Sequence, residues 1–368
     1  MRLLVQPGDG VLPLIKGIAA AKSSVEIVIF RFDQREIEHA LATAVTRGVA
    51  VHALIAHTNR AGEDGLRRLE MRLLAAGVSV ARTADDLARY HGKLMIVDRR
   101  DLYLLAFNLT YGDIEHSRSF GLITRSRAVV REAALLFEAD TKRMTFEPGL
   151  ERFLVSPINA RRQLAGFIKD AKKELLIYDP KVSDPAMSQL LTERTQAGVD
   201  VRVIGRMTRK VNGVRVHKLP GMRLHTRTMI RDRNLAFIGS QSLREIELDA
   251  RREVGLIFRD SKVVGRLRRV FEEDWALCEQ PGATREQEES VSTSKIAKKV
   301  AKALTKDLPP VAPLLDGAVK ELVGEKTEVE LNAQEVEEIV KDAVKDAVRE
   351  AVREVVEEVV EHHEGAAK

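Results

Sequence analysis

One spacing of three residue types occurs twice in this chain of 368 residues: a histidine, a basic residue two places on and an aspartate seven places on. The two copies consist of His91, Lys93 and Asp98 in YHGKLMIVD, and of His225, Arg227 and Asp232 in LHTRTMIRD. In both copies a glycine follows 30 residues after the histidine, as Gly121 and Gly255. A single short motif carries a real risk of coincidence, whereas two copies with matching flanks indicate a duplicated unit.

The duplication extends along most of the first 280 residues. Gly48 recurs as Gly198 at an offset of 150, whereas Phe137 recurs as Phe271 at an offset of 134. Because the offset falls from 150 to 134, the first copy carries 16 extra residues upstream of its motif histidine. We predict two copies of one unit that face each other about a pseudo-twofold axis.

Each copy alternates strand-like and helix-like patterns. In the first copy, apolar runs at 25–30 and 49–56 predict buried strands, and residues 36–47 predict an amphipathic helix. The region that holds the extra residues contains AGEDGLRRLEMRLLAAG, which predicts a further helix. We therefore expect an α/β fold of two pseudo-symmetric units, 1–143 and 151–280, each a mixed β-sheet flanked by helices.

Residues 281–368 differ in composition from the rest of the chain. They contain 13 Lys and Arg against 20 Asp and Glu, a net charge of −7, which leaves 47 against 35, a net charge of +12, in residues 1–280. A region this basic suits an anionic partner such as a phospholipid headgroup, a membrane surface or a nucleic acid. We predict that 281–368 form a flexible linker and an acidic amphipathic helical tail. This helix is expected to support self-association or to bind Lys295, Lys298, Lys299 and Lys302 of the same chain.

Two further features of the sequence bear on the cellular location and on the redox chemistry of the protein. No apolar stretch approaches the length of about 20 residues that spans a bilayer, and the N-terminus shows no charged and then apolar leader. We therefore expect a cytoplasmic protein, peripheral to the inner face of the membrane where its substrate is a lipid. Cys278 is the only cysteine, which excludes an intramolecular disulfide and leaves no thiolate cluster for a metal.

The spacing within each motif predicts where its side chains point. In a strand that begins at the histidine, the two-residue period places His91 and Lys93 on one face and Asp98 on the other. We expect the histidine and the basic residue to contact one ligand while the aspartate anchors the turn behind them, and we expect the same of the second copy. One strand further on, Asn108 and Ser240 can donate hydrogen bonds to that ligand.

Two histidines in equivalent settings suit double displacement at a phosphodiester. A neutral imidazole attacks phosphorus in line, while a second, protonated imidazole donates a proton to the departing oxygen. The non-bridging oxygens would be neutralised and oriented by the side chains of Lys93, Arg227, Asn108 and Ser240. This chemistry requires neither a metal ion nor another cofactor.

Each imidazole also needs a carboxylate that fixes its tautomer. Glu253, 28 residues after His225, is expected to orient His225, whereas the matching position in the first unit is Ser119. Asp113 and Glu115 lie close by in sequence and are the substitutes for a carboxylate there. This asymmetry leaves open which histidine is the nucleophile, and the lysine retained in the first motif favours the first.

The paired H-x-K-x4-D motifs resemble those of the phospholipase D superfamily, and the resemblance covers about residues 1–280. The segments AVTRGVAVHALIA, RYHGKLMIVD and GSQSLREIELDARREVG are similar to bacterial phosphatidylserine synthase-like and cardiolipin synthase-like members. The resemblance implies two phospholipase D-type α/β units with one shared active site, a phosphohistidine intermediate and metal-independent hydrolysis or transesterification. By motif match it implies roles for His91, Lys93, Asp98 and Asn108, and for His225, Asp232, Ser240 and Glu253.

Departures from the family pattern keep three functions open. Arg227 stands where the family has lysine, and Ser119 where it often has glutamate. We favour a phospholipase D-type enzyme that cleaves or exchanges phospholipid headgroups. The alternatives are a nuclease or nucleic-acid phosphodiesterase that uses the same site, and a binding protein that has lost catalysis. The aromatic content of 4% favours lipid, because single-stranded nucleic acids stack on aromatic side chains.

Overall fold

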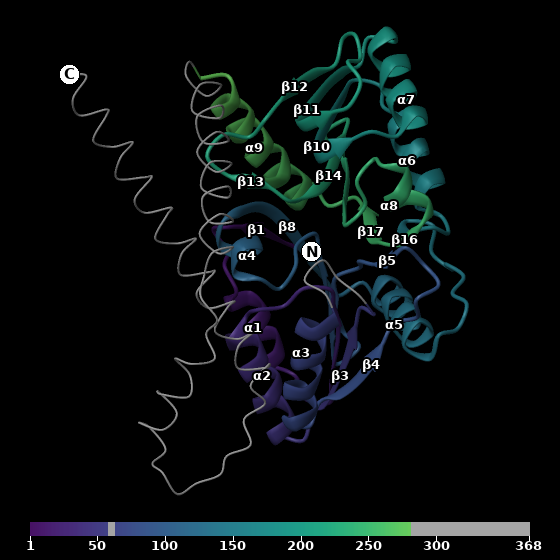
Figure 1. The fold of residues 1–368 in the computed structure, drawn as a ribbon. Coiled ribbons are helices and arrows are strands. Elements are labelled where there is room, and N and C mark those ends of the chain that lie inside the picture. Colours follow the sequence, from purple (N-terminus) through teal and green to yellow (C-terminus); the bar gives the residue numbers. More distant parts are fainter. Residues whose placement is uncertain (58–62, 281–368) are drawn as a thin grey trace, which may run out of the picture. The chain divides into compact units, whose positions relative to one another are not determined.

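The structure is a computed structural model in which residues 1–57 and 63–280 are described. The linker and helical tail predicted at 281–368 lie outside the described residues. Residues 1–280 form one compact unit, which contains two large sheets with helices on their faces (Figure 1). Within the described part of the chain, no helix combines the length and the apolar character that a membrane span requires.

The first sheet belongs mainly to the first half of this unit. Its strands are β1 (Arg2–Gln6), β2 (Ser24–Ile29), β3 (Ala50–Ile55), β4 (Ser79–Arg82), β6 (Leu94–Val97), β7 (Asp101–Leu105) and β8 (Ser117–Thr124). They lie in the order β1-β8-β7-β6-β2-β3-β4, in which β2, β3 and β4 are parallel and the other neighbours antiparallel. The helices of this half are α1 (Leu12–Ala19), α2 (Arg35–Thr46), α3 (Glu63–Ala75), α4 (Tyr111–Glu115) and α5 (Arg127–Lys142).

The second sheet repeats the first. Its strands are β9 (Phe153–Val155), β10 (Glu174–Val182), β11 (Asp200–Met207), β12 (Arg215–His217), β14 (Arg227–Arg231), β15 (Leu235–Gly239) and β17 (Val254–Phe258). Their order is β12-β11-β10-β14-β15-β17-β9, and β10, β11 and β12 are again the parallel strands. The helices of this half are α6 (Ala160–Lys169), α7 (Pro185–Gln196), α8 (Glu245–Asp249) and α9 (Ser261–Cys278).

Strand order and strand direction therefore agree between the two halves, which confirms the predicted α/β fold of two pseudo-symmetric units with mixed sheets. The helix predicted in the insert region of the first half is α3, and no helix takes its place between β11 and β12. The predicted helix at 36–47 is α2, and the predicted strands at 25–30 and 49–56 are β2 and β3. The unit boundaries at 143 and 151 stay predictions.

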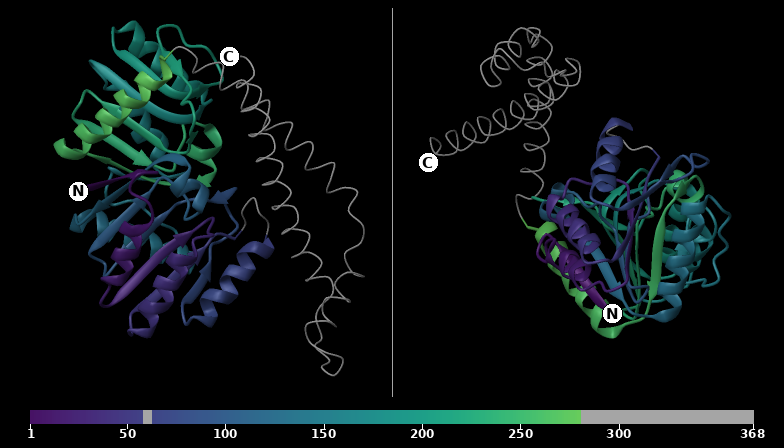
Figure 2. Two further views of the ribbon diagram at one scale, coloured as in Figure 1. Left: turned by 90° about the vertical axis from the view of Figure 1, so that its left-hand side faces the viewer. Right: turned by 90° about the horizontal axis from the view of Figure 1, so that it is seen from below.

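The apolar side chains explain the layering. One cluster of buried residues joins the inner faces of the two sheets to α5 and α9, as in Phe120, Phe137, Tyr178 and Phe271. A second cluster covers the outer face of the first sheet with α1, α2 and α3, and a third covers that of the second sheet with α6 and α7. α5 and α9 thus pack on the inner side of the two sheets, each with one face exposed, and the other long helices lie on the outer faces (Figure 2). Strands buried on both faces need nearly continuous apolar runs, as the sequence shows.

Two short strands cross between the halves. β13 (Arg223–Leu224) of the second half pairs with β8 of the first, and β5 (Arg89–Tyr90) of the first half pairs with β16 (Arg251–Arg252) of the second. Each crossing strand immediately precedes a motif histidine. The backbone N–H of that histidine donates to a carbonyl of the other half, at 2.7 Å in one copy and 3.1 Å in the other. The fold therefore embeds each motif histidine in the opposite half.

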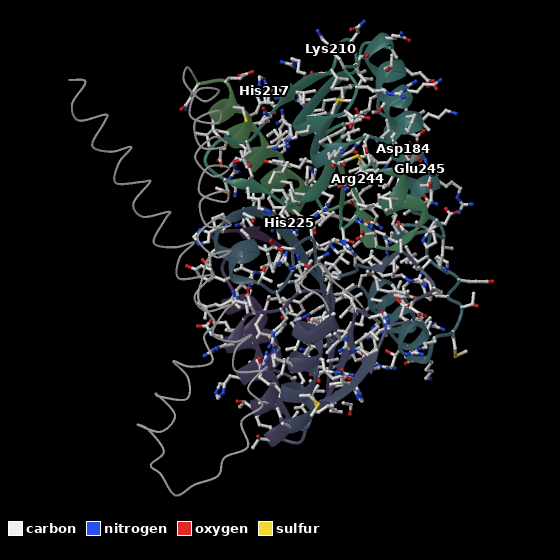
Figure 3. The ribbon with its side chains drawn as sticks, in the orientation of Figure 1. Asp184, Lys210, His217, His225, Arg244 and Glu245 are labelled. Atoms are coloured by element: carbon white, nitrogen blue, oxygen red, sulfur yellow. The ribbon has the colours of Figure 1, made fainter. Side chains whose placement is uncertain are left out.

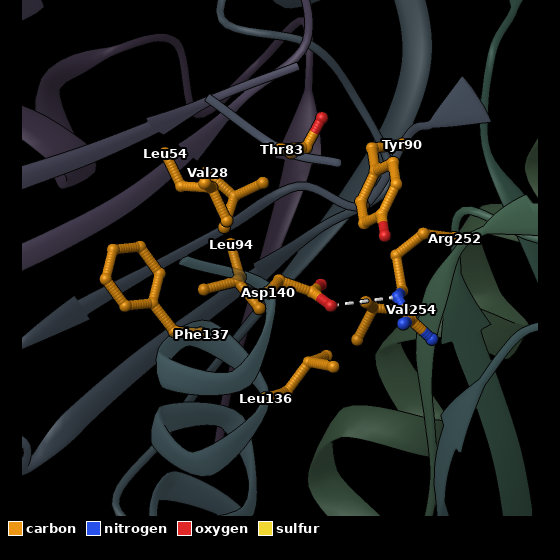
Figure 4. A pocket seen from close by; sticks show the side chains of 11 residues that line it. Val28, Leu54, Thr83, Tyr90, Leu94, Leu136, Phe137, Asp140, Arg252 and Val254 are labelled. Atoms are coloured by element: carbon orange, nitrogen blue, oxygen red, sulfur yellow. Dashed lines mark ion pairs between the residues drawn. The ribbon is translucent and has the colours of Figure 1, made fainter. Parts of the chain in front are cut away.

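Two ion pairs also join the two halves. Arg118 of the first half binds Asp274 of the second at 2.8 Å, and Arg252 of the second half binds Asp140 of the first at 3.1 Å. Asp274 also accepts a hydrogen bond of 2.6 Å from the hydroxyl of Tyr178. The residue that matches Tyr178 in the first half is Val28, which lines a small apolar cavity of about 10 Å³ beside the Asp140–Arg252 pair (Figure 4).

Candidate active site

The motif aspartates hold the turns behind the site. The Asp98 carboxylate accepts hydrogen bonds from the backbone N–H groups of Lys22, Ser23 and Ser24, which lead into β2. Asp232 accepts from the N–H groups at the start of β10, those of Lys172, Lys173 and Glu174. Both aspartates have positive φ angles, 53° and 49°, at tight turns between antiparallel strands. Neither carboxylate is paired with a motif histidine.

The expected strand beginning at the histidine is wrong for both copies. His91 and Lys93 lie in the segment between β5 and β6, and His225 lies between β13 and β14, which begins at Arg227. The local geometry is nevertheless the same in both. Lys93 Nζ donates to the carbonyl of His91 at 2.7 Å, and Arg227 Nη1 donates to the carbonyl of His225 at 2.7 Å. Each cation is thus buried beside the histidine of its own motif.

Glu253 hydrogen bonds to His91 across the two halves. Its carboxylate oxygens lie 2.9 and 3.0 Å from His91 Nδ1, and both side chains are buried. The expectation that Glu253 orients His225, the histidine of its own copy, is therefore wrong. The reason is the crossing of β5, which brings His91 next to Arg252 and hence next to Glu253. A carboxylate on Nδ1 holds the proton there, so that Nε2 keeps its lone pair.

The surroundings of His225 are different. Ser119 occupies the position that matches Glu253, and neither its hydroxyl nor His225 Nδ1 has a hydrogen-bond partner among the described residues. The nearest carboxylate is Asp113, whose Oδ2 lies 3.6 Å from His225 Nε2. This carboxylate also accepts hydrogen bonds from Asn108 Nδ2 at 2.6 Å and from Arg223 Nη1 at 2.6 Å. Figure 3 shows His225 near the boundary between the two halves.

Asn108 and Ser240, expected to bind the ligand, both make bonds within the protein. The Asn108 amide nitrogen donates a hydrogen bond to Asp113. The buried Oδ1 of Asn108 has no partner among the described residues. The Ser240 hydroxyl accepts from the N–H of Val254 at 3.0 Å. Burial raises the pKa of Glu253, and the charge of Lys93 and the hydrogen bond with Ser240 oppose this shift, so that Ser240 supports the carboxylate beside His91.

Phe30 is a site residue that the sequence pattern did not reveal. Its ring packs edge-on against His91, with centroids 4.4 Å apart and an interplanar angle of 81°. Lys93 Nζ lies 5.6 Å from the same ring centroid. Phe30 follows the apolar run of β2, so nothing in its spacing distinguishes it from a core residue. An aromatic wall of this kind restrains the imidazole and excludes water from one side of it.

Burial controls the protonation of the cluster. Burial, and then the charge of Lys93, lowers the pKa of His91 well below its ordinary value. Burial and the charge of Arg227 do the same for the pKa of His225. Burial also lowers the pKa of Lys93 to about 7, although Glu253 opposes this shift. Lys93 and Arg227 each act on both histidines, so the two motifs form one electrostatic cluster with neutral imidazoles at neutral pH.

A pair of buried imidazoles flanked by two cations, on a duplicated α/β fold, is the arrangement of a phosphodiesterase or phosphotransferase. A family model described as "Cardiolipin synthase, PLD-like domain" matches residues 14–141 and 164–275. The chain therefore belongs to this phospholipase D-like family of phosphodiesterases and phosphotransferases, which confirms the resemblance. No curated protein matches the sequence significantly.

Two solved structures with TM-scores above 0.5 share the fold. A polyphosphate kinase from Porphyromonas gingivalis is similar with a TM-score of 0.63 and 18% identity, over 74% of this chain and 50% of that one. The chain thus spans about half the length of that kinase. A phosphatidylserine synthase from Haemophilus influenzae Rd KW20 gives a TM-score of 0.57 and 11% identity, over 76% and 86% of the two chains. Nuc from Salmonella typhimurium, a phospholipase D family member, gives a TM-score of 0.36 and 18% identity, over 40% and 97%.

Proposed function

We propose that the protein is a phospholipase D-type phosphodiesterase or phosphatidyltransferase that cleaves or exchanges phospholipid headgroups through a phosphohistidine on His91. The observation that carries the proposal is the buried hydrogen bond between His91 Nδ1 and Glu253. It supports a neutral imidazole whose Nε2 lone pair is free to attack phosphorus. The matching serine beside His225 supports a different role for that histidine.

In the first step, His91 Nε2 forms a bond to phosphorus while the bond from phosphorus to the leaving oxygen breaks. His225, protonated, gives its proton to that oxygen. Burial and then the nearby cations lower the pKa of His225, and a bound phosphodiester anion favours the protonated form because it offsets those cations. Lys93 and Arg227 stabilise the charge on the non-bridging oxygens.

In the second step, His225 takes a proton from water or from an alcohol. The oxygen so activated attacks phosphorus, and the bond from phosphorus to His91 Nε2 breaks. Water gives hydrolysis, and an alcohol gives headgroup transfer. Glu253 keeps Nδ1 of His91 protonated through both steps, which makes His91 both a nucleophile and a leaving group. We propose that the reaction needs no metal ion.

A lipid substrate is supported by the description of the matching family and by the low aromatic content of the chain. We accordingly propose action at the inner face of the membrane, with the protein peripheral to it. The net charge of +12 in residues 1–280 favours a second candidate, a nucleic-acid phosphodiesterase that uses the same site. Self-association through the tail remains a separate proposal.

The deciding experiment offers the full chain, in EDTA, mixed phospholipid vesicles and, separately, single-stranded DNA. Headgroup release or exchange that is lost in His91→Ala and in His225→Ala supports the first function. Cleavage of DNA with the same dependence supports the second. Mass spectrometry of a quenched reaction with phospholipid should find the phosphatidyl group on His91 alone. No turnover of either substrate would overturn both functions and leave a binding protein.

A further inference from the structure

The residues that lead into the second motif histidine carry positive charges and no negative ones. Between residues 206 and 223 the chain contains six cations and no carboxylate, namely Arg206, Arg209, Lys210, Arg215, Lys218 and Arg223. This stretch, which we name the basic segment, runs from the end of β11 through β12 to β13. The matching stretch of the first half, residues 56–89, carries five Asp and Glu. The charge therefore belongs to one half and is not a product of the duplication.

Three of these cations have no counter-charge among the described residues. Arg206, Arg209 and Lys210 are exposed, and none of them forms an ion pair with the part of the chain that the structure describes. Arg215, in contrast, binds Asp200 at 2.6 Å, and Arg223 binds Asp113 at 2.6 Å. Unpaired neighbouring cations repel one another, so such a cluster attracts an anionic partner more strongly than an internally paired surface does.

The basic segment connects directly to the site. β13 ends at Leu224, next to His225, and Arg223 binds the same Asp113 carboxylate that lies 3.6 Å from His225. Figure 3 shows Lys210 at the outer end of the second half, with His217 between it and His225 in the view. The segment thus spans from the outer end of the second half to the catalytic cluster.

We propose that the basic segment is a docking surface for a membrane that contains anionic phospholipid, and that it holds the second half of the protein against the lipid. The biological role of this surface rests on the proposed function, whereas the attraction of its cations to anionic lipid does not. Basic residues close to an anionic leaflet add attraction within about a Debye length of it, roughly 10 Å. The exposed Val216 adds an apolar contact between two of the cations.

Membrane fits the segment better than single-stranded nucleic acid does. No Phe, Trp or Tyr occurs between residues 206 and 223. The ring of His217 is already packed edge-on against Trp275, with centroids 4.5 Å apart. Stacking platforms for unpaired bases are therefore missing from the segment, whereas a lipid headgroup needs only the cations and the apolar contact.

The test measures binding without turnover. The full chain is sedimented with vesicles of phosphatidylglycerol and phosphatidylcholine, and with vesicles of phosphatidylcholine alone. We expect binding to the first only, and weaker binding at higher salt. The triple variant Arg206→Gln, Arg209→Gln, Lys210→Gln should bind about a hundredfold more weakly, since each charge contributes about fivefold.

The matched control removes three cations elsewhere. Arg127, Arg131 and Lys142 are exposed on α5 and have no ion pair among the described residues. Their replacement by Gln lowers the net charge by the same amount and should change vesicle binding by less than about threefold. Equal losses in the two triple variants would overturn the docking surface, as would a failure of the wild type to bind anionic vesicles.

Two further outcomes distinguish lipid docking by the basic segment from nucleic-acid binding and from catalysis. If the triple variant loses affinity for a DNA duplex or oligonucleotide but not for vesicles, the surface binds nucleic acid and the proposal is wrong. Headgroup turnover is followed on the same vesicles in parallel. Binding that depends on the basic segment, without any turnover, would overturn the proposed function while supporting the docking surface.

Discussion

Glu253 of the second half hydrogen bonds to His91 of the first half, at 2.9 Å, while Ser119 occupies the matching place beside His225. The two motifs have the same spacing of histidine, basic residue and aspartate, yet their histidines are not equivalent in the folded protein. One imidazole has a buried carboxylate on Nδ1, and the other has an unpaired Nδ1. The asymmetry supports our proposal that the histidine with the fixed tautomer is the nucleophile.

The first prediction follows from this difference. Glu253→Gln should lower kcat by roughly a thousandfold, because an amide no longer stabilises the protonated Nδ1 and can favour the wrong tautomer. Ser119→Ala, at the matching position, should change kcat by less than about threefold. Steady-state rates on a phosphodiester substrate measure both, and circular dichroism confirms that both variants are folded. Similar losses in the two variants would mean that the histidines share one role.

The second prediction concerns pH. Burial lowers the pKa of Lys93 to about 7, so in the free enzyme this cation is lost as the pH rises through 7. The value of kcat/KM should then fall by about a hundredfold between pH 6 and pH 9, because phosphate binding requires the protonated form. Lys93→Arg keeps its charge over this range and should flatten the alkaline side of the profile.

The control for the pH profile is the matching residue of the second motif. Arg227→Lys introduces a second buried lysine, and it should make the alkaline fall steeper. An alkaline fall that is the same in Lys93→Arg and in the wild type would assign the titration to another group.

The sequence predicted the duplication, the α/β class and α3, because each depends on local periodicity or on repeated spacing. It did not predict the partner of Glu253. That contact depends on β5 and β16, which pair over only two residues each and leave no period to detect. The role of Phe30 was equally hidden, because an aromatic residue after an apolar strand has the pattern of a core position. The contacts of the site that join the two halves cannot be predicted from the sequence pattern of one copy of the repeat.

The third prediction concerns the motif aspartates. Burial alone would raise the pKa of Asp98, but the N–H donors of Ser23, Ser24 and Lys22 outweigh it and hold the pKa below its ordinary value. Asp98→Asn should therefore reduce the free energy of unfolding by about 1–3 kcal/mol at neutral pH. Chemical denaturation measures the loss, and kcat well below the melting temperature should stay within about threefold.

The dependence on pH provides the control for this variant. A carboxylate with a depressed pKa stabilises the fold above its ordinary pKa, and this contribution is lost as the pH falls through the folded value. The stability difference between the wild type and Asp98→Asn should therefore shrink below about pH 4. A large loss of kcat at full stability would instead give Asp98 a part in the chemistry.

The fourth prediction tests the ion pairs that join the halves. The Tyr178 hydroxyl donates to Asp274 at 2.6 Å in a buried setting, and Asp274 is held there by Arg118. Tyr178→Phe removes a donor from a buried carboxylate, which should cost about 1–3 kcal/mol and lower the melting temperature by several degrees. Tyr90→Phe is the matched control, because the Tyr90 hydroxyl donates at 2.8 Å to Asp86, which is exposed and can bind water instead.

Thermal unfolding followed by circular dichroism should show the larger shift in melting temperature for Tyr178→Phe. Equal shifts would mean that the buried pair contributes no more to holding the halves together than a surface hydrogen bond does.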